Sequence, residues 1–175
     1  NYDHSMEMLR TAKADLWFGH LEIKGIEMQN GVINEHGLSK SDFKRFDRVV
    51  SGHFHKHTDD GQIFYCGAQY EMTWSDYQDP KAFHIFDTET RELTRISNPL
   101  TIHKKIIYDD KKKDYTNFDI QPYNNHFIKL IVLNKTNEEV FDKFLERLYN
   151  EITVHDLNIV EDYSDIKASV REDIL

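Results

Sequence analysis

Two short apolar runs in this chain each end in a glycine followed by a histidine, and this repeated pattern constrains the fold more than any other feature. Residues 15–19 lead to His20, and residues 48–51 lead through Gly52 to His53. Short apolar runs that stop at glycine are typical of buried strands. If the two strands run parallel in one sheet, their carboxyl ends meet at the edge where open α/β sheets bind ligands. The pattern therefore predicts an α/β fold with histidines gathered at one sheet edge.

A third histidine, His55, extends the second cluster. In extended backbone alternate side chains share a face, so His53 and His55 are expected to point the same way while Phe54 points into the protein. An isolated histidine after a strand is usually a surface residue, but imidazoles at close spacing are common metal ligands. We therefore interpret His20, His53 and His55 as metal ligands. His57 lies beside a polar turn and is interpreted as part of an exposed loop.

Together with these histidines, an ordered set of segments resembles the calcineurin-like metallophosphoesterases. Residues 18–20 (Phe-Gly-His) and 51–55 (Ser-Gly-His-Phe-His) resemble the last two metal-binding motifs of that family. The closer resemblance is to its SbcD-type DNA repair nuclease branch, in particular to the recombination endonuclease subunits of T-even-like phages. It covers about residues 15–110 and also rests on residues 21–25, 34–43, 63–67 and 79–90.

The chain also departs from the family, which builds its site from five motifs. The first three, Asp-x-His, Gly-Asp-x-x-Asp and Gly-Asn-His-Asp, are absent, and residues 125–126 (Asn-His) lack the glycine and the aspartate of the third. Residues 67–69 read Gly-Ala-Gln where the family has Gly-Ser/Thr-Pro. The chain begins at Asn1 without a methionine. We therefore expect an internal or carboxyl-terminal part of a longer protein, with its catalytic residues upstream of Asn1 and none within it.

The resemblance implies a metal-dependent DNA exo/endonuclease subunit that acts in recombination and double-strand-break processing. His20 and His53 would bind one divalent ion and His55 a second, in two-metal hydrolysis of a phosphodiester. Mn²⁺ is the expected ion, with Mg²⁺ or Zn²⁺ as alternatives; three histidines alone favour zinc, nickel or copper on affinity grounds. The implied partners are DNA and an SbcC-type ATPase subunit, and the implied location is the cytoplasm, including that of a phage-infected bacterial cell.

The missing motifs include the carboxylate that bridges the two ions, and this limits what residues 1–175 are expected to do alone. Without it two cations repel each other strongly, so we expect at most one weakly bound ion and no phosphodiesterase activity. Half a sheet would also expose an apolar edge and face, which favours a homodimer.

Three other interpretations remain open. Another metallophosphoesterase, such as a nucleotide or protein phosphatase, would carry the same motifs. A cupin-like metal barrel is loosely imitated by His53 and His55 followed by Asp60 and Gly67, although its second motif is not visible. The chain could also be a non-catalytic binding module with vestigial ligands.

Composition restricts the partner surfaces. The net charge of −9, from 22 basic and 31 acidic residues, argues against a generally basic nucleic-acid surface. DNA contact would then depend on a local cluster, for which Lys111, Lys112 and Lys113 are the candidates, although such a run is often only a solvated stretch. The single cysteine excludes a disulfide framework, and no apolar run is long enough for a membrane span.

Hydrophobic periodicity and the resemblance together divide the chain into three parts. Residues 1–110 are expected to form the carboxyl-terminal half of a metallophosphoesterase β-sandwich flanked by helices, 111–125 a polar linker, and 126–175 a small, incomplete α/β capping-like domain. The expected elements are a helix over 5–13, a serine-capped short helix within 38–43, and strands at 15–19, 47–51, 62–66, 81–87, 92–97 and 101–108. The last part should be strand 127–133, a helix begun by a capping box of Thr136 and Glu139, and a parallel strand at 157–160.

Overall fold

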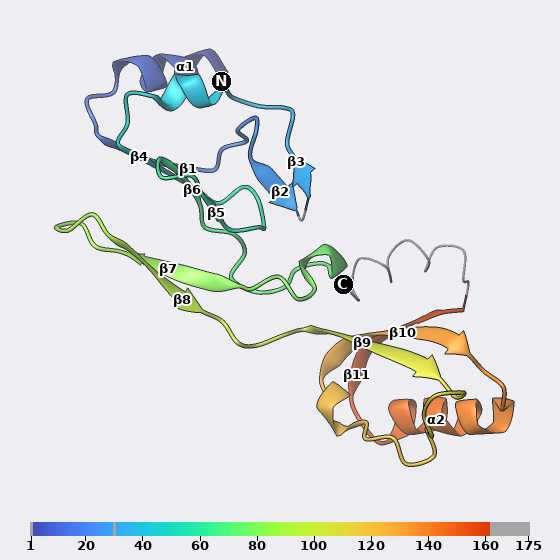
Figure 1. Ribbon diagram of the computed structural model, residues 1–175. Helices are drawn as coiled ribbons and strands as arrows, with labels where there is room; N and C mark the ends of the chain where they lie inside the picture. Colours follow the sequence, from blue (N-terminus) through green and yellow to red (C-terminus); the bar gives the residue numbers. More distant parts are fainter. Residues whose placement is uncertain (1, 30, 162–175) are drawn as a thin grey trace. The chain divides into compact units, whose positions relative to one another are not determined.

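The computed structural model describes residues 2–29 and 31–161, and the chain divides into two compact units between Leu100 and Thr101 (Figure 1). Each unit contains its own β-sheet together with helices. The mixed α/β class expected from the sequence is therefore confirmed.

The central sheet of the first unit has four strands in the order β1-β4-β6-β5. They are β1 (Leu16–Gly19), β4 (Arg48–Ser51), β5 (Thr58–Asp59) and β6 (Ile63–Tyr65). β1, β4 and β6 run parallel, and β5 is antiparallel to β6. Val49 and Val50 in β4 are both buried, as expected of a central strand covered on both faces. The predicted parallel pairing of the two Gly-His strands is confirmed.

Helices cover one face of this sheet. α1 (Tyr2–Thr11) and the 3₁₀ helix η1 (Lys40–Phe43) contribute to a core of Leu9, Ile23, Ile26, Phe43, Phe46, Val49, Phe54, Ile63 and Tyr65. The Arg45 guanidinium donates to the carbonyls of Leu9, Arg10 and Ala12, which satisfies groups left open where α1 ends. Ser39 caps η1, so the serine-capped helix is confirmed.

A β-hairpin packs on the other face of the sheet. β7 (Ala82–Phe86) and β8 (Leu93–Ser97) are antiparallel. The ring of Phe86 lies 5.1 Å from that of Phe18, and the ring of His84 lies 5.0 Å from that of Phe64. Phe83 and Ile85, on the alternate positions of β7, are 47% and 56% exposed. The hairpin therefore adds a layer to the sheet and presents an apolar strip outward.

The remaining short elements of the first unit lie in its connections. β2 (Glu27–Gln29) pairs antiparallel with β3 (Val32–Ile33), and the 3₁₀ helix η2 spans Trp74–Asp76. The turn between β7 and β8 is held by Asp87, whose Oδ1 accepts from the backbone N–H groups of Glu89 and Thr90 at 2.8 Å each. This turn joins the two strands predicted at 81–87 and 92–97, which are confirmed as β7 and β8.

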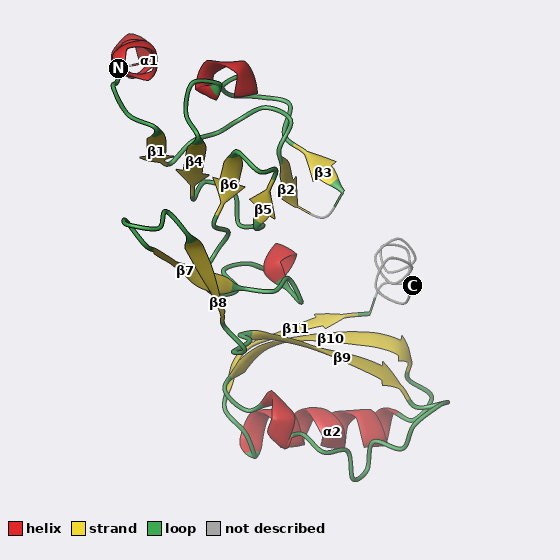
Figure 2. Ribbon diagram, turned by 60° about the vertical axis from the view of Figure 1, so that its left-hand side comes forward, coloured by secondary structure: helices red, strands yellow, loops and turns green. Residues whose placement is uncertain are grey.

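The second unit is a three-stranded parallel sheet in the order β11-β10-β9, with α2 on one face (Figure 2). Its elements are β9 (His103–Asp109), the 3₁₀ helix η3 (Gln121–Tyr123), β10 (His126–Asn134), α2 (Glu138–Asn150) and β11 (Val154–Val160). Phe141, Phe144 and Leu148 of α2 are buried against Ile106, Tyr108, Ile128, Leu130 and Val132 of the sheet. The predicted β-α-β unit with parallel strands is confirmed over the described residues; residues 162–175 of the expected capping domain lie outside them.

The boundary between the units differs from the expected one. β9 pairs with β10 from His103 to Asp109, so the strand expected to close the first part belongs to the second unit. The segment 111–125 then connects two strands of one sheet, and it is not an inter-domain linker. Tyr115 and Ile120 from this segment are buried in the core beside α2, with Phe118 and Tyr123 packed against them. Because most residues of this segment are polar, its sequence did not indicate that these four apolar residues pack in the core.

The start of α2 also differs. Asn137, not Thr136, is the N-cap, and its side chain accepts from the N–H of Val140 at 3.1 Å. The predicted capping box is wrong because the backbone N–H of Thr136 and that of Asn137 are already bonded to the Asp110 carboxylate. Among the residues that the structure describes, no helix is both long and apolar enough to cross a membrane.

Candidate metal centre

Two of the three predicted ligands meet at the carboxyl edge of the sheet. Gly19 at the end of β1 is paired with Ser51 at the end of β4, so the residues that follow each strand emerge side by side. The imidazole of His20 lies with its centroid 5.0 Å from that of His53, at an interplanar angle of 79°. Parallel pairing of the Gly-His strands therefore produces the histidine pair that the sequence predicted; metal binding by the pair stays a prediction.

Buried hydroxyl groups fix the backbone beside His20. Leu21 donates its N–H to Ser51 Oγ at 2.9 Å, and its carbonyl accepts from the Tyr65 hydroxyl at 2.8 Å. Burial raises the pKa of Tyr65 to about 12, so this hydroxyl keeps its proton and acts as a donor at neutral pH. β4 and β6 thus hold the turn that carries His20.

The chain around His53 bends. β4 ends at Ser51, and residues 53–56 are bends, so the extended alternation expected for His53 and His55 is wrong. Gly52 ends the strand before the alternation can begin. Phe54 nevertheless points inward as expected; it is 5% exposed, and its ring stacks on Tyr65 at 4.8 Å. This buried phenyl ring anchors the loop between the two histidines.

The side chain of His55 lies beside an acidic group. Its Nδ1 is 3.3 Å from Oδ2 of Asp76, a carboxylate that is only 3% exposed. The backbone carbonyl of His55 accepts from the N–H of Ala68 at 2.9 Å and from the Lys81 ammonium at 3.1 Å. Sequence reasoning missed Asp76 and Lys81. Asp76 lay in a stretch interpreted as a loop and Lys81 at the start of the strand expected at 81–87, and nothing in the sequence connected either residue to His55.

Gly67 allows the histidine loop to close. Its φ of +75° lies in the left-handed region, and a Cβ there would be 2.9 Å from both the His55 carbonyl oxygen and the His57 nitrogen. A side chain at this position would push the histidine loop away. The segment 67–69 thus supports the loop even though it lacks the serine or threonine and the proline of the family pattern.

His57 is not an exposed loop residue. Its Nδ1 donates to the Tyr65 carbonyl at 2.7 Å, and its ring lies 4.9 Å from Phe64 and 5.5 Å from His84. The interpretation from sequence was wrong because β5 begins at Thr58 and turns the chain back along β6. His57 is thereby held by packing on the sheet.

The donor set of the described residues is partial. Within residues 2–29 and 31–161, no three histidine, cysteine, aspartate or glutamate side chains form a group able to hold a metal ion. His20 and His53 supply two neighbouring imidazoles, which is half of the four ligands of a typical zinc site. Two neighbouring imidazoles could supply part of a ligand set, and metal binding here stays a prediction.

We compared the sequence with known protein families and with characterised proteins. No known family profile matches the chain. The chain is 32% identical over 175 residues to exonuclease subunit 1 of Enterobacteria phage T4, in an alignment that covers 99% of this chain and 48% of that protein. This chain is a relative of a phage exonuclease subunit. It spans about half the length of that relative, and the resemblance to a phage nuclease subunit expected from the motifs is confirmed.

In this relative of an exonuclease subunit, the three predicted DNA-contacting lysines lie in the second unit, after β9. The Lys112 ammonium is 3.5 Å from the Asp109 carboxylate, and that of Lys113 lies 4.2 Å from the centre of the Phe118 ring. Lys111 donates its backbone N–H to Asp109 at 3.3 Å. The run is therefore tied to its own unit and is not an extended hinge. Whether it contacts DNA stays a prediction.

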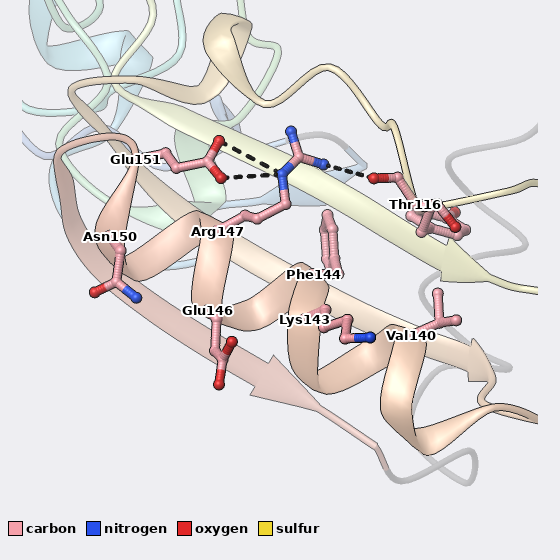
Figure 3. A pocket seen from close by; sticks show the side chains of 9 residues that line it. Thr116, Val140, Lys143, Phe144, Glu146, Arg147, Asn150 and Glu151 are labelled. Carbon is pink, nitrogen blue, oxygen red and sulfur yellow. Dashed lines mark hydrogen bonds and ion pairs between the residues drawn. The ribbon is translucent and has the colours of Figure 1, made fainter.

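A pocket of about 410 Å³ lies beside α2 in the same unit (Figure 3). Its cations are held in ion pairs: Lys143 with Glu139 at 2.6 Å, and Arg147 with Glu151 at 3.3 Å. Arg147 also donates to the Thr116 carbonyl. With both cations neutralised within the unit, the pocket has little attraction for a phosphate group.

Proposed function

We propose that this chain is part of a metal-dependent DNA exo/endonuclease subunit that acts in recombination and double-strand-break processing. The observation that carries the proposal is the pair of imidazoles, His20 and His53, at the carboxyl ends of two paired parallel strands. The similarity to a phage exonuclease subunit along 99% of the chain supports the assignment to a nuclease. The reaction proposed is two-metal hydrolysis of a phosphodiester bond.

The proposed ligands divide between two ions. His20 and His53 would bind one, and His55 the other, with the remaining ligands and the bridging carboxylate outside the described residues. We expect Mn²⁺, with Mg²⁺ or Zn²⁺ as alternatives; when bound, such ions activate a water molecule and neutralise charge on the attacked phosphate. The residues of this chain orient the imidazoles. Ser51 and Tyr65 hold the turn after His20, and Phe54 anchors the loop after His53.

The packing of the first unit supports the proposed sandwich. Helices lie on one face of its sheet and the β7–β8 hairpin on the other, as in one half of a metallophosphoesterase β-sandwich. The second unit would be the capping-like domain, with Lys111, Lys112 and Lys113 as its proposed DNA contact. The outward strip of Phe83 and Ile85 is consistent with a homodimer, and an SbcC-type ATPase is the proposed partner in the cytoplasm.

The arrangement of strands argues against the cupin alternative. Cupins are double-sheet jelly rolls, which belong to the antiparallel architectures. β1, β4 and β6 are parallel, and both histidine motifs follow parallel strands. Within the phosphoesterase class, the named relative favours a nuclease over a phosphatase.

The test compares residues 1–175 with the longer protein that we propose carries them. The longer protein should bind two Mn²⁺ ions per chain and cleave duplex DNA only when Mn²⁺ is present. Residues 1–175 alone should bind at most one ion weakly and should cleave neither single- nor double-stranded DNA. Metal counting by electron paramagnetic resonance and a nuclease assay with chelator controls measure both. Cleavage of DNA by the longer protein in the presence of excess chelator would contradict the proposal.

A further inference from the structure

We propose that Asp76, held in place by Lys81, is the positioning residue of His55: it fixes the Nδ1–H tautomer of the imidazole and so leaves Nε2 as the metal-binding nitrogen. The metal-binding part of this inference rests on the proposed function. The hydrogen bond and the tautomer rest on the geometry of the first unit alone.

The Asp76 carboxylate is built into the protein. Its Oδ2 accepts from the backbone N–H groups of Met72 at 3.0 Å and Thr73 at 2.9 Å, and from the Thr73 hydroxyl at 3.3 Å. Its Oδ1 accepts from the Lys81 ammonium at 2.8 Å. The oxygen that faces His55 is thus held by three donors from the loop before it. A side chain fixed in this way can impose an orientation on the imidazole beside it.

The donors around this group decide the tautomer. Both oxygens of Asp76 accept hydrogen bonds, Oδ2 from the backbone N–H groups of Met72 and Thr73 and Oδ1 from the Lys81 ammonium. With donors on both oxygens, the carboxylate serves as an acceptor toward His55 as well. The proton in the contact between Asp76 and His55 must then be on the imidazole Nδ1, and in a neutral imidazole the other nitrogen, Nε2, carries a free lone pair.

Lys81 joins the side chain of Asp76 to the backbone of His55. Its ammonium is 3% exposed and donates to three oxygens: Asp76 Oδ1 at 2.8 Å, Asp79 Oδ2 at 2.6 Å, and the His55 carbonyl at 3.1 Å. All three of its protons are used. Because one buried cation binds both the carboxylate and the histidine backbone, the distance between the acceptor and the imidazole is fixed from both sides.

Asp79 provides a matched control in the same cluster. Its carboxylate pairs with Lys81 at 2.6 Å and is 17% exposed, whereas the carboxylate that His55 contacts is that of Asp76. Asp76→Asn and Asp79→Asn therefore each remove one negative charge next to Lys81. In Asp76→Asn the amide oxygen that accepts from the backbone of residues 72 and 73 still faces His55 but carries no charge, so the loop keeps its bonds while the Nδ1–H form of His55 loses its charged acceptor.

The experiment begins with the unaltered chain. Long-range ¹H–¹⁵N correlation spectra of residues 1–175, with the His55 signal assigned by a His55→Gln variant, report the tautomer directly. We expect His55 to be in the Nδ1–H form at neutral pH, and Asp76→Asn to move the population toward Nε2–H. Asp79→Asn should leave the tautomer unchanged. A native His55 in the Nε2–H form would overturn the inference whether or not any variant folds.

The second measurement is Mn²⁺ affinity of the longer protein. Loss of an outer partner of a metal-binding histidine lowers affinity by about 10- to 100-fold, and we expect this range for Asp76→Asn but no change for Asp79→Asn. Equal losses of Mn²⁺ affinity in the two variants would show that Asp76 does not position His55 for the metal and only stabilises the fold. If instead the native longer protein shows no Mn²⁺-dependent nuclease activity while His55 keeps the Nδ1–H form, the proposed function fails and the tautomer assignment stands.

Discussion

The two units differ in how they use buried polar groups. In the first unit, Asn34, Ser51, Glu71, Asp76 and Lys81 are buried, and its central sheet has strands of only two to four residues. In the second unit the strands have seven to nine residues, and its core is formed by aromatic and aliphatic side chains from α2 and the sheet; the buried polar residues among those described there are His103 and Asp109, both in β9. Burying a polar group costs free energy unless its hydrogen bonds are satisfied. Bonded polar groups in a core therefore indicate places where the positions of particular side chains or loops are fixed.

In the first unit these groups fix the orientation of loops. Ser51 is bonded to the turn after His20, and Asp76 and Lys81 are bonded to His55. The sheet places two strand ends side by side, and hydrogen bonds that involve Ser51, Asp76 and Lys81 fix the positions of the loops that carry the histidines. The second unit has regular packing instead, which favours stability. Substitutions in the two units should therefore affect different properties.

The largest effect should come from the histidines. His53→Ala or His55→Ala in the longer protein should lower Mn²⁺-dependent DNA cleavage by more than about 100-fold, since loss of a ligand exceeds loss of its outer partner. Both side chains are partly exposed and outside the core, so the circular dichroism spectrum should not change. His36→Ala, at an exposed histidine of the same unit, is the control and should keep full activity. Unchanged cleavage by either ligand variant would remove the basis for the proposed site.

The opposite effect is expected in the second unit. Phe144 is 1% exposed and its ring contacts those of Tyr108, Tyr115 and Phe118. Phe144→Ala should lower the free energy of unfolding by about 3–5 kcal/mol, because it removes a buried ring and leaves a cavity. Urea unfolding followed by circular dichroism measures the loss. Tyr149→Ala, at a residue of α2 that is 60% exposed, should change stability by less than about 0.5 kcal/mol. Similar losses in the two variants would show that α2 is not packed as described.

A smaller effect would sharpen the comparison within the first unit. Tyr65→Phe removes the hydroxyl that donates to the Leu21 carbonyl but keeps the ring that stacks on Phe54. Since Ser51 Oγ also lies 3.2 Å from that carbonyl, the loss should be only about 1 kcal/mol. The imidazole signals of His20 should shift while those of His55 stay in place. Tyr70→Phe, at a residue that is 50% exposed, is the control. Equal shifts at the two histidines would mean that one network holds the whole loop region.

The features that followed from sequence were those set by local pattern. Apolar runs ending in glycine indicated β1 and β4, hydrophobic periodicity indicated the β-α-β unit, and two closely spaced strand patterns at 81–87 and 92–97 indicated β7 and β8. Each depends on neighbouring residues and on backbone preferences that a single sequence carries.

The features that sequence missed depend on contacts between distant segments. Asp76 lies 21 positions after His55, in a stretch with no periodicity to connect them. The unit boundary was displaced because a polar segment hid Tyr115 and Ile120, which are buried only when β9 and β10 pair around it. The bend after Gly52 was missed because an alternating pattern of histidines was taken for a strand.

The smallest expected effect concerns the pH dependence of the first unit. Burial lowers the pKa of His84, and the nearby His57 and Arg95 lower it further. Its Nε2 is buried without a hydrogen-bond partner among the described residues, and its ring packs edge-on against Phe64. Burial here favours the neutral imidazole, while the unfolded chain is free to take up the proton near the ordinary pKa of about 6.5.

This difference fixes the sign of the effect. As the pH falls below about 6.5 the unfolded state binds more protons than the folded state, so the free energy of unfolding should decrease toward pH 5. His84→Phe keeps a ring against Phe64 but cannot be protonated, so it should flatten this slope. Phe83→Leu, at the next position of β7, changes no titratable group and should keep the native slope. Urea unfolding at several pH values between 5 and 8 measures it. A slope unaltered by His84→Phe would mean that protonation of the folded unit at this imidazole is as easy as in the unfolded chain, and that the layer between the β7–β8 hairpin and the sheet is open to water.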